Sequence, residues 1–305
     1  MIVDCHGHFN TQKDFIRNAK KYLTDEWARR IYGFMVRAPN KAEEATTVEA
    51  WIESLDRYGV DKVLLQTAPF GGSDAVAEFQ NKAPDRFVGL ANIDFVDPEG
   101  SNSVREVERC ARELGLKGIG ELYPQMGPWD PGDKRFFPIY EKAEELGLPI
   151  MIHGGIEPFA APFNHEKYGD PYMLDPALRA FPDLPFIVCH MAGDLVHRLF
   201  TLMMCRQNLY AEISSFTTHI PTPHAGMFGV TPSQVMQNFL AKGFADRLLW
   251  ATDVQAPYFS EVQKNTVQGE TIKDNYVVKI LNELNVSEED KAKILGENAK
   301  KVFKL

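Results

Sequence analysis

Short apolar runs and amphipathic stretches alternate along almost the whole chain. In residues 47–58, Trp51, Leu55 and Tyr58 recur at helical spacing, which predicts a helix with one buried face. A threonine at position 46 or 47 can cap its start, and Gly59 can end it. The apolar run that follows, at residues 61–67, has the length of a strand. A helix followed directly by a strand is therefore the unit to look for in the rest of the chain.

This unit recurs up to residue 253, and only helices are predicted after it. Residues 1–8 supply one more predicted strand in front of it, so that the total is eight. Predicted strands span residues 1–8, 61–67, 87–93, 117–122, 149–153, 185–190, 209–213 and 247–253. The other predicted helices span residues 74–83, 101–114, 135–146, 173–181, 194–206, 231–242, 275–284, 287–296 and 298–303.

Strands that alternate with helices pair in parallel through right-handed crossovers. Eight such units predict a (β/α)8 TIM barrel with extra C-terminal helices, and a doubly wound open sheet is the alternative. No composition shift marks a linker, so residues 1–305 are expected to form a single domain. The longer loops all follow strands, which would place them at the C-terminal face, where barrels of this kind keep their active sites. These loops are residues 9–45, 154–172, 214–230 and 254–274.

Composition narrows the class of protein. The chain has 305 residues, of which 44% are hydrophobic and 25% charged, as in ordinary globular proteins. The net charge of -9 argues against nucleic acid or an anionic membrane as partner, so we expect a small-molecule substrate. The chain has neither an apolar run of membrane-spanning length nor a signal sequence, which favours a cytoplasmic location. A homo-oligomer is compatible with the fold but nothing in the sequence requires one.

The four cysteines show no C-x-x-C spacing, which disfavours a thiolate zinc site. Cys5 and Cys189 each precede a histidine on a predicted strand. Since neighbouring side chains of a strand point to opposite faces, both cysteines are expected to face away from those histidines and to serve as packing residues.

Polar side chains stand at the ends of five predicted strands. On the first strand, His6 and His8 share a face with Asp4, which lies deeper and is expected to support them without binding a metal itself. In a closed barrel the carboxyl ends of all strands meet at one mouth. Imidazoles and carboxylates suit a divalent cation, most of all Zn²⁺, with Mn²⁺ as an alternative. The predicted metal-binding residues are His6, His8, Glu121, His153, His190 and Asp253.

Each of these residues also has a structural interpretation. A lone His153 or His190 at the end of an apolar strand is more often a hydrogen-bonded structural residue. Asp253 could cap the next helix, and Glu121 could pair with an arginine. Their coincidence at several strand ends favours the metal site. Weaker candidates for substrate contacts lie in or beside the loops over the predicted mouth: Tyr123, His165, His219, His224 and Arg37.

Taken together, these motifs make the chain resemble the amidohydrolase superfamily, and more closely its amidohydrolase-related branch, which includes aminocarboxymuconate semialdehyde decarboxylase and related hydrolases and hydratases. The motifs that carry the resemblance are Asp4-x-His6-x-His8 and the segments 148–155, 181–193, 248–253 and 294–299. The resemblance implies that His6, His8, His153 and Asp253 bind metal. It implies that His190 acts on the substrate or binds a second metal, and that Glu121 corresponds to the glutamate that bridges two ions.

Three functions follow as hypotheses. The first is metal-dependent hydrolysis of a small amide, ester or lactone, in which a metal-activated water attacks and Asp253 takes its proton. The second is non-oxidative decarboxylation with one ion, in which His190 manages protonation of the carbon that loses carbon dioxide. The third is a barrel without catalysis that serves as a scaffold. One ion or two per chain separates the second hypothesis from the first.

Overall fold

The computed structural model describes residues 1–8, 47–67, 72–93, 101–126, 130–156, 165–215, 230–254, 257–259 and 269–305. The strands are β1 (Val3–His8), β2 (Lys62–Gln66), β3 (Phe87–Gly89), β4 (Ile119–Leu122), β5 (Ile150–Ile152), β6 (Phe186–Val188), β7 (Leu209–Glu212) and β8 (Leu248–Leu249). The helices include α3 (Val48–Tyr58), α4 (Ser73–Lys82), α5 (Ser101–Arg112), α6 (Phe137–Leu146), α7 (Asp175–Ala180), α8 (Val196–Cys205), α10 (Pro232–Ala241), α11 (Tyr276–Glu283), α12 (Glu288–Ala292) and α13 (Asn298–Phe303).

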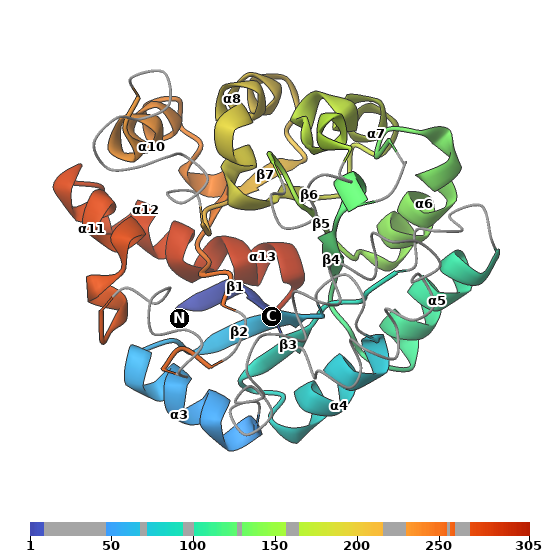
Figure 1. Cartoon of the computed structure of the whole chain (residues 1–305), viewed down its shortest axis with the longest axis horizontal. Coiled ribbons are helices and arrows are strands. Elements are labelled where there is room, and N and C mark those ends of the chain that lie inside the picture. The colour runs from blue at the N-terminus through green and yellow to red at the C-terminus, as the bar shows by residue number, and fades with distance from the viewer. Residues whose placement is uncertain are drawn as a thin grey trace.

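All eight strands pair in parallel and in chain order, in one sheet of β1 to β3 and another of β4 to β8. Backbone hydrogen bonds join the two sheets at both edges. The amide of Ala91 donates to the carbonyl of Gly118 at 2.8 Å, and the amide of His8 donates to the carbonyl of Val254 at 2.7 Å. The strands lie at the centre of the molecule and the helices surround them (Figure 1). The predicted (β/α)8 TIM barrel is therefore confirmed.

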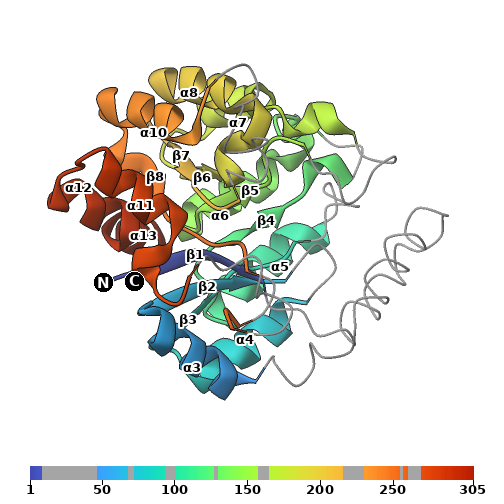
Figure 2. The same ribbon diagram turned by 60° about the vertical axis from the view of Figure 1, so that its left-hand side comes forward.

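Helix ends follow the sequence signals. The side chain of Thr47 accepts a hydrogen bond from the amide of Ala50, and Gly59 ends α3 with φ 85°. That left-handed conformation suits glycine because it lacks a Cβ. Ser287 caps α12, where its side chain accepts from the amide of Asp290. The extra C-terminal helices α11 to α13 lie together on one side of the barrel (Figure 2).

The apolar residues form two layers. Strand side chains such as Leu64, Met151 and Leu249 fill the barrel interior together with Phe303 of α13. A larger cluster packs the strands against the surrounding helices. At the C-terminal end of the barrel the interior side chains become polar, and this change defines the candidate site.

Six of the eight strands end earlier than predicted. Since β5 ends at Ile152, β6 at Val188 and β8 at Leu249, His153 directly follows its strand, and His190 and Asp253 lie further beyond theirs. Both have left-handed backbones, with φ 58° and 59°, a conformation that costs energy for a residue other than glycine. The interpretation of these two residues as strand residues is wrong, although both still reach the mouth of the barrel.

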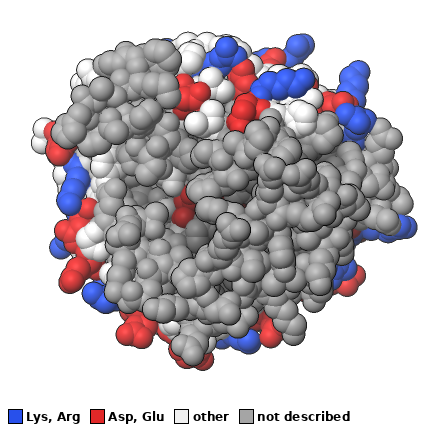
Figure 3. All heavy atoms as spheres, in the orientation of Figure 1, with Lys and Arg blue, Asp and Glu red and all other residues white. Residues whose placement is uncertain are grey.

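Among the described residues, no helix has both the length and the apolar character needed to cross a membrane. On the described part of the face in Figure 3, lysine and arginine side chains are interspersed with aspartate and glutamate. The predicted loop at residues 9–45 lies outside the described residues.

Candidate metal centre

One group of side chains gathers around Nε2 of His6. The Nε2 atom of His8 lies 3.0 Å from it, Oε2 of Glu121 3.2 Å and Oδ1 of Asp253 3.5 Å. The same Oδ1 atom is 3.1 Å from Nε2 of His8. Strands β1 and β4 and the segment after β8 therefore bring two imidazoles and two carboxylates to one point.

The other oxygen of Glu121 faces a second group. Oε1 lies 3.1 Å from Nδ1 of His153 and 3.3 Å from Nε2 of His190. His153 follows β5 directly, and its ring stacks on Tyr123 at 5.1 Å between centroids. Glu121 thus stands between the two groups, and all six predicted metal-binding residues lie in one cluster, in which Asp253 is half-buried and the other five are buried.

Glu212 belongs to this cluster and was missed in the sequence. It is fully buried at the end of β7, and its Oε2 atom lies 3.0 Å from Nδ1 of His6. The signal was present, because Glu212 is a polar residue near the end of a predicted strand like the other site residues. It was overlooked because it is not part of a histidine motif.

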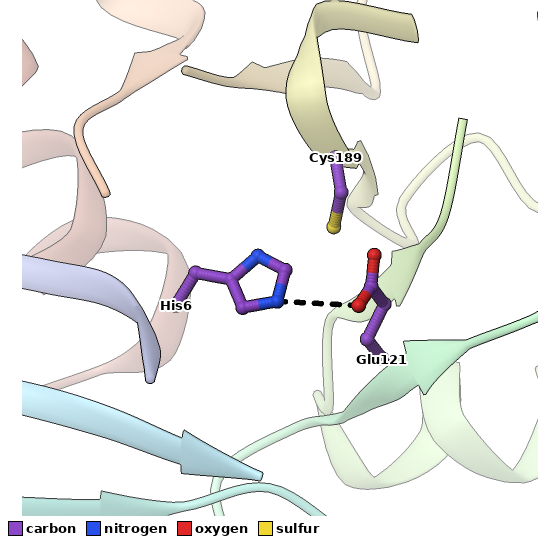
Figure 4. Close-up of side chains that lie close together, drawn as sticks. All are labelled: His6, Glu121 and Cys189. Carbon is purple, nitrogen blue, oxygen red and sulfur yellow. Dashed lines mark ion pairs between the residues drawn. The ribbon is translucent and has the colours of Figure 1, made fainter. Parts of the chain in front are cut away.

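The expectation for Cys189 was wrong. Its side chain points toward the space between His6 and Glu121 (Figure 4), and its sulfur lies within 4.8 Å of ligand atoms of both. Cys189 continues the inward face of Ile187, whereas the left-handed backbone at His190 turns the following imidazole inward as well. Burial raises the pKa of the Cys189 thiol well above its usual value, so this side chain packs as a neutral thiol. Cys5 is likewise buried in the barrel interior.

Asp4 contacts the site through hydrogen bonds and is not part of the groups of candidate ligand atoms found among the described residues. Its carboxylate accepts hydrogen bonds from the hydroxyls of Tyr258 and Thr252 at 2.6 and 2.5 Å, and from the backbone amides of Thr252 and His6. These bonds tie β1 to the segment that carries Asp253. Asp253 itself accepts a hydrogen bond from the hydroxyl of Ser215 through Oδ2, at 3.0 Å.

Charges within the cluster stabilise one another. Burial alone would lower the pKa of His6, but the negative charges of Glu121 and Asp253 outweigh it and hold that pKa well above its usual value. Burial would likewise raise the pKa of Glu121. The positive charge of His6 and hydrogen bonds from His153 and His190 instead keep it well below its usual range. Carboxylates gathered around imidazole nitrogens are the kind of donor set that a cation site requires.

Buried polar atoms with incomplete hydrogen bonding mark the same region. Nδ1 of His8 has no hydrogen-bond partner among the described residues, and Oε2 of Glu121 has ion-pair contacts with His6 and His8 but no hydrogen bond of good geometry. A buried polar atom with incomplete hydrogen bonding costs free energy, and a cation bound to Oε2 of Glu121 would reduce that cost. Imidazole nitrogens and carboxylate oxygens are donors that zinc and manganese accept. The donor set therefore fits a divalent cation.

The side chain of Gln66 is also buried with polar atoms that have no described hydrogen-bond partner. Gln66 ends β2, is fully buried, and pairs with His8 on β1. It shares a strand face with Leu64, which packs in the barrel interior. Both atoms of its amide group, and the hydroxyl of Thr67, lack a partner within the described ranges. An amide that is buried at the mouth can donate to and accept from a polar ligand.

Of the weaker candidates for substrate contacts, one lies beside the cluster, one does not, and three lie outside the described residues. Tyr123 lies beside His153, as described above, whereas His165 is exposed and packs near Tyr168, 6.0 Å between ring centroids. His165 is not part of the cluster. Arg37, His219 and His224 lie outside the described residues.

Comparison with known proteins identifies the family. A family model described as Amidohydrolase matches residues 3–305. The chain belongs to the amidohydrolase family. The expectation of an amidohydrolase-type enzyme is thereby confirmed, and the TIM barrel is the fold of its structural relatives.

Individual relatives of this amidohydrolase carry decarboxylase names. A 2-amino-3-carboxymuconate-6-semialdehyde decarboxylase from Dictyostelium discoideum is 32% identical over 33% of this chain, and the alignment spans only 32% of that protein. A gamma-resorcylate decarboxylase from Rhodococcus jostii is 24% identical over 76% of this chain and 75% of its own length.

A solved structure shows the same fold. It is a 5-carboxyvanillate decarboxylase from Novosphingobium aromaticivorans, in complex with manganese and a nitrobenzoic acid, and it matches with a TM-score of 0.67 and 21% identity over 100% of this chain and 96% of that one. The expectation of hydrolysis finds no support among these relatives, while the alternative of decarboxylation does.

Proposed function

We propose that this amidohydrolase-family protein catalyses the metal-dependent, non-oxidative decarboxylation of a small aromatic or unsaturated carboxylic acid. The observation that carries the proposal is the position of His190. Its ring is buried, and Nε2 faces the cluster 3.3 Å from Glu121. The decarboxylase names of the relatives support the same reaction.

His6, His8 and Asp253, together with Oε2 of Glu121, would hold one divalent cation. Bound there, the cation would orient substrate oxygens and stabilise the negative charge that develops as carbon dioxide leaves. Zinc and manganese both fit these donors. Manganese has the additional support of its presence in the 5-carboxyvanillate decarboxylase structure.

The chain's own residues handle the proton. Decarboxylation breaks the bond between the carboxylate carbon and its neighbour, and the electron pair stays on that neighbouring carbon. His190 then donates the proton on Nε2 to this carbon and recovers it from solvent. One proton is consumed and one carbon dioxide is released per turnover. A histidine suits this role because its usual pKa lies near neutral pH.

The polar lining favours a substrate with oxygen substituents beside the carboxylate. The buried amide of Gln66 offers one donor and one acceptor without a described partner. A hydroxyl or carbonyl oxygen of the substrate would satisfy it. A wholly apolar acid would leave the amide unpaired and should bind poorly.

The test uses protein purified without chelators and begins with elemental analysis, for which we expect one divalent cation per chain. Carbon dioxide release is then measured with 2,6-dihydroxybenzoate, 5-carboxyvanillate and unsaturated dicarboxylic acids, beside a panel of lactones and amides. Chelated protein, with and without added manganese or zinc, is the control. Hydrolysis of a lactone or amide without carbon dioxide release from any acid would refute the proposal.

A further inference from the structure

Glu212 contacts His6 directly and also contacts two groups at His190, the backbone amide of His190 and the hydroxyl of Ser214. Its Oε2 atom lies 3.0 Å from Nδ1 of His6, 2.8 Å from the hydroxyl of Ser214 and 3.4 Å from the backbone amide of His190. Its Oε1 atom accepts a hydrogen bond from the backbone amide of Ser214. Glu212 and Ser214 are both buried.

The chemistry of these groups fixes the proton on His6. A backbone amide can only donate, and a carboxylate accepts, so Glu212 is the acceptor in its contacts with Ser214 and His190. The contact with His6 becomes a donation from Nδ1 once a cation binds at Nε2, because the cation takes the Nε2 lone pair and leaves Nδ1 as the only position for the proton of a neutral ring. In the cation-loaded protein, neutral His6 therefore has its proton on Nδ1, where Glu212 accepts it at 3.0 Å.

The same carboxylate acts on His190 through Ser214. The Ser214 hydroxyl has a single proton, which it donates to Glu212. Its oxygen must therefore accept from Nδ1 of His190, which lies 2.9 Å away. The backbone carbonyl of Ser214, which can only accept, lies 3.3 Å from the same nitrogen. His190 thus keeps a proton on Nδ1, and Nε2 is the atom left to exchange a proton inside the site.

We infer that Glu212 is a positioning residue which, directly for His6 and through Ser214 for His190, holds the proton of both rings on Nδ1. Both Nε2 atoms are thereby presented to the site, one for the cation and one for the substrate. A carboxylate or carbonyl behind a metal-binding histidine orients the ring and raises its affinity for the metal. The roles toward the cation and the substrate rest on the proposed function, whereas the proton position on His190 does not.

Two measurements test this inference on the zinc-loaded protein, since zinc is diamagnetic. Nitrogen NMR of ¹⁵N-histidine-labelled protein at alkaline pH reports which nitrogen of His190 carries the proton. Competition with a chromophoric chelator reports zinc affinity. The variants are Glu212→Gln, which keeps the shape but removes the charge, and Ser214→Ala. Ser54→Ala, which removes a buried hydroxyl from α3, is the matched control.

We expect His190 to carry its proton on Nδ1 in the parent protein, and the form with the proton on Nε2 to increase in both site variants. Zinc affinity should fall about 10- to 100-fold in Glu212→Gln and remain near the parent value in Ser214→Ala and Ser54→Ala. A parent His190 protonated on Nε2, or a Glu212→Gln variant with unchanged zinc affinity, would overturn the inference. If Glu212→Gln fails to fold, the Ser214→Ala spectrum decides. Neither readout needs substrate, so a failure of the decarboxylation assay would leave this result standing.

Discussion

The Oε2 atom of Glu121 lies 3.2 Å from the Nε2 atom of His6, and this contact joins the two sheets across the mouth of the barrel. Both atoms are buried, and neither side chain is exposed to solvent. Glu121 therefore both stabilises the cluster and is stabilised by its contacts with it. Its role in cation binding can be separated from its role in packing by a substitution that preserves its shape.

Glu121→Gln should weaken cation binding by about 100-fold or more. Loss of a residue that only hydrogen-bonds to a metal ligand costs about 10- to 100-fold in affinity, and Glu121 is proposed to be a ligand itself. Residual binding should persist through His6, His8 and Asp253. Chelator competition measures the affinity, with Glu113→Gln on the exposed surface as control. An unchanged affinity would place the cation away from Oε2.

Acidification should release the cation. Burial lowers the pKa of His6, but the negative charges of Glu121 and Asp253 raise it by more. The pKa of His6 therefore lies well above its usual value of 6.5. Below that raised pKa a proton occupies Nε2 and competes with the cation, since a metal binds the unprotonated nitrogen. Affinity should therefore rise as pH increases from 6 through neutral to alkaline values. The measurement is chelator competition across that range, corrected for the chelator's own protonation. A flat profile would contradict the competition.

His190→Asn should lower kcat for decarboxylation by about 10²- to 10⁴-fold, the usual contribution of a proton-transfer group. The cation should stay bound, because the hydrogen-bond and ion-pair contacts of Nε2 of His6 are with His8, Glu121 and Asp253. Elemental analysis and carbon dioxide release measure the two effects. His197→Asn, at an exposed position of α8, is the matched control. Loss of one of two ions in His190→Asn would instead indicate a two-metal centre.

The sequence was sufficient to predict the barrel fold and to predict that the six clustered residues lie together. His6, His8, Glu121 and His153 stand in or directly after their strands, so the rule that parallel strand ends converge was enough to group them. The expectations of a single domain, of a cytoplasmic location and of a homo-oligomer stay predictions.

The sequence failed where the backbone leaves regular structure or where polar groups act in a second layer. Cys189 was assigned to the wrong face because it was placed opposite His190. Alternation from Ile187 to Cys189 holds, and the left-handed backbone at His190 turns the imidazole to the same side. Glu212 was passed over because its function depends on contacts with His6 and Ser214 from other parts of the chain. No periodicity along a single strand encodes such contacts.

Gln66→Met should stabilise the cation-free protein while weakening substrate binding. The parent amide is buried without a hydrogen-bond partner among the described residues, and replacing an unpaired polar group by an apolar one of similar size removes its desolvation cost. We expect the free energy of unfolding to rise by about 1–2 kcal/mol. The substrate's oxygen would lose its amide partner, so KM should increase about 5-fold, in line with the ~1 kcal/mol net value of one hydrogen bond.

The matched control is Gln125→Met. Gln125 is equally buried, but its amide donates a hydrogen bond to the carbonyl of Gly155 at 2.8 Å. Gln125→Met removes this hydrogen bond and leaves the Gly155 carbonyl without the amide donor. The free energy of unfolding should therefore fall by about 1 kcal/mol. Urea unfolding of both variants measures the opposite signs. If Gln66→Met is destabilised as well, its amide is already paired in the free protein and its assignment to the substrate is wrong.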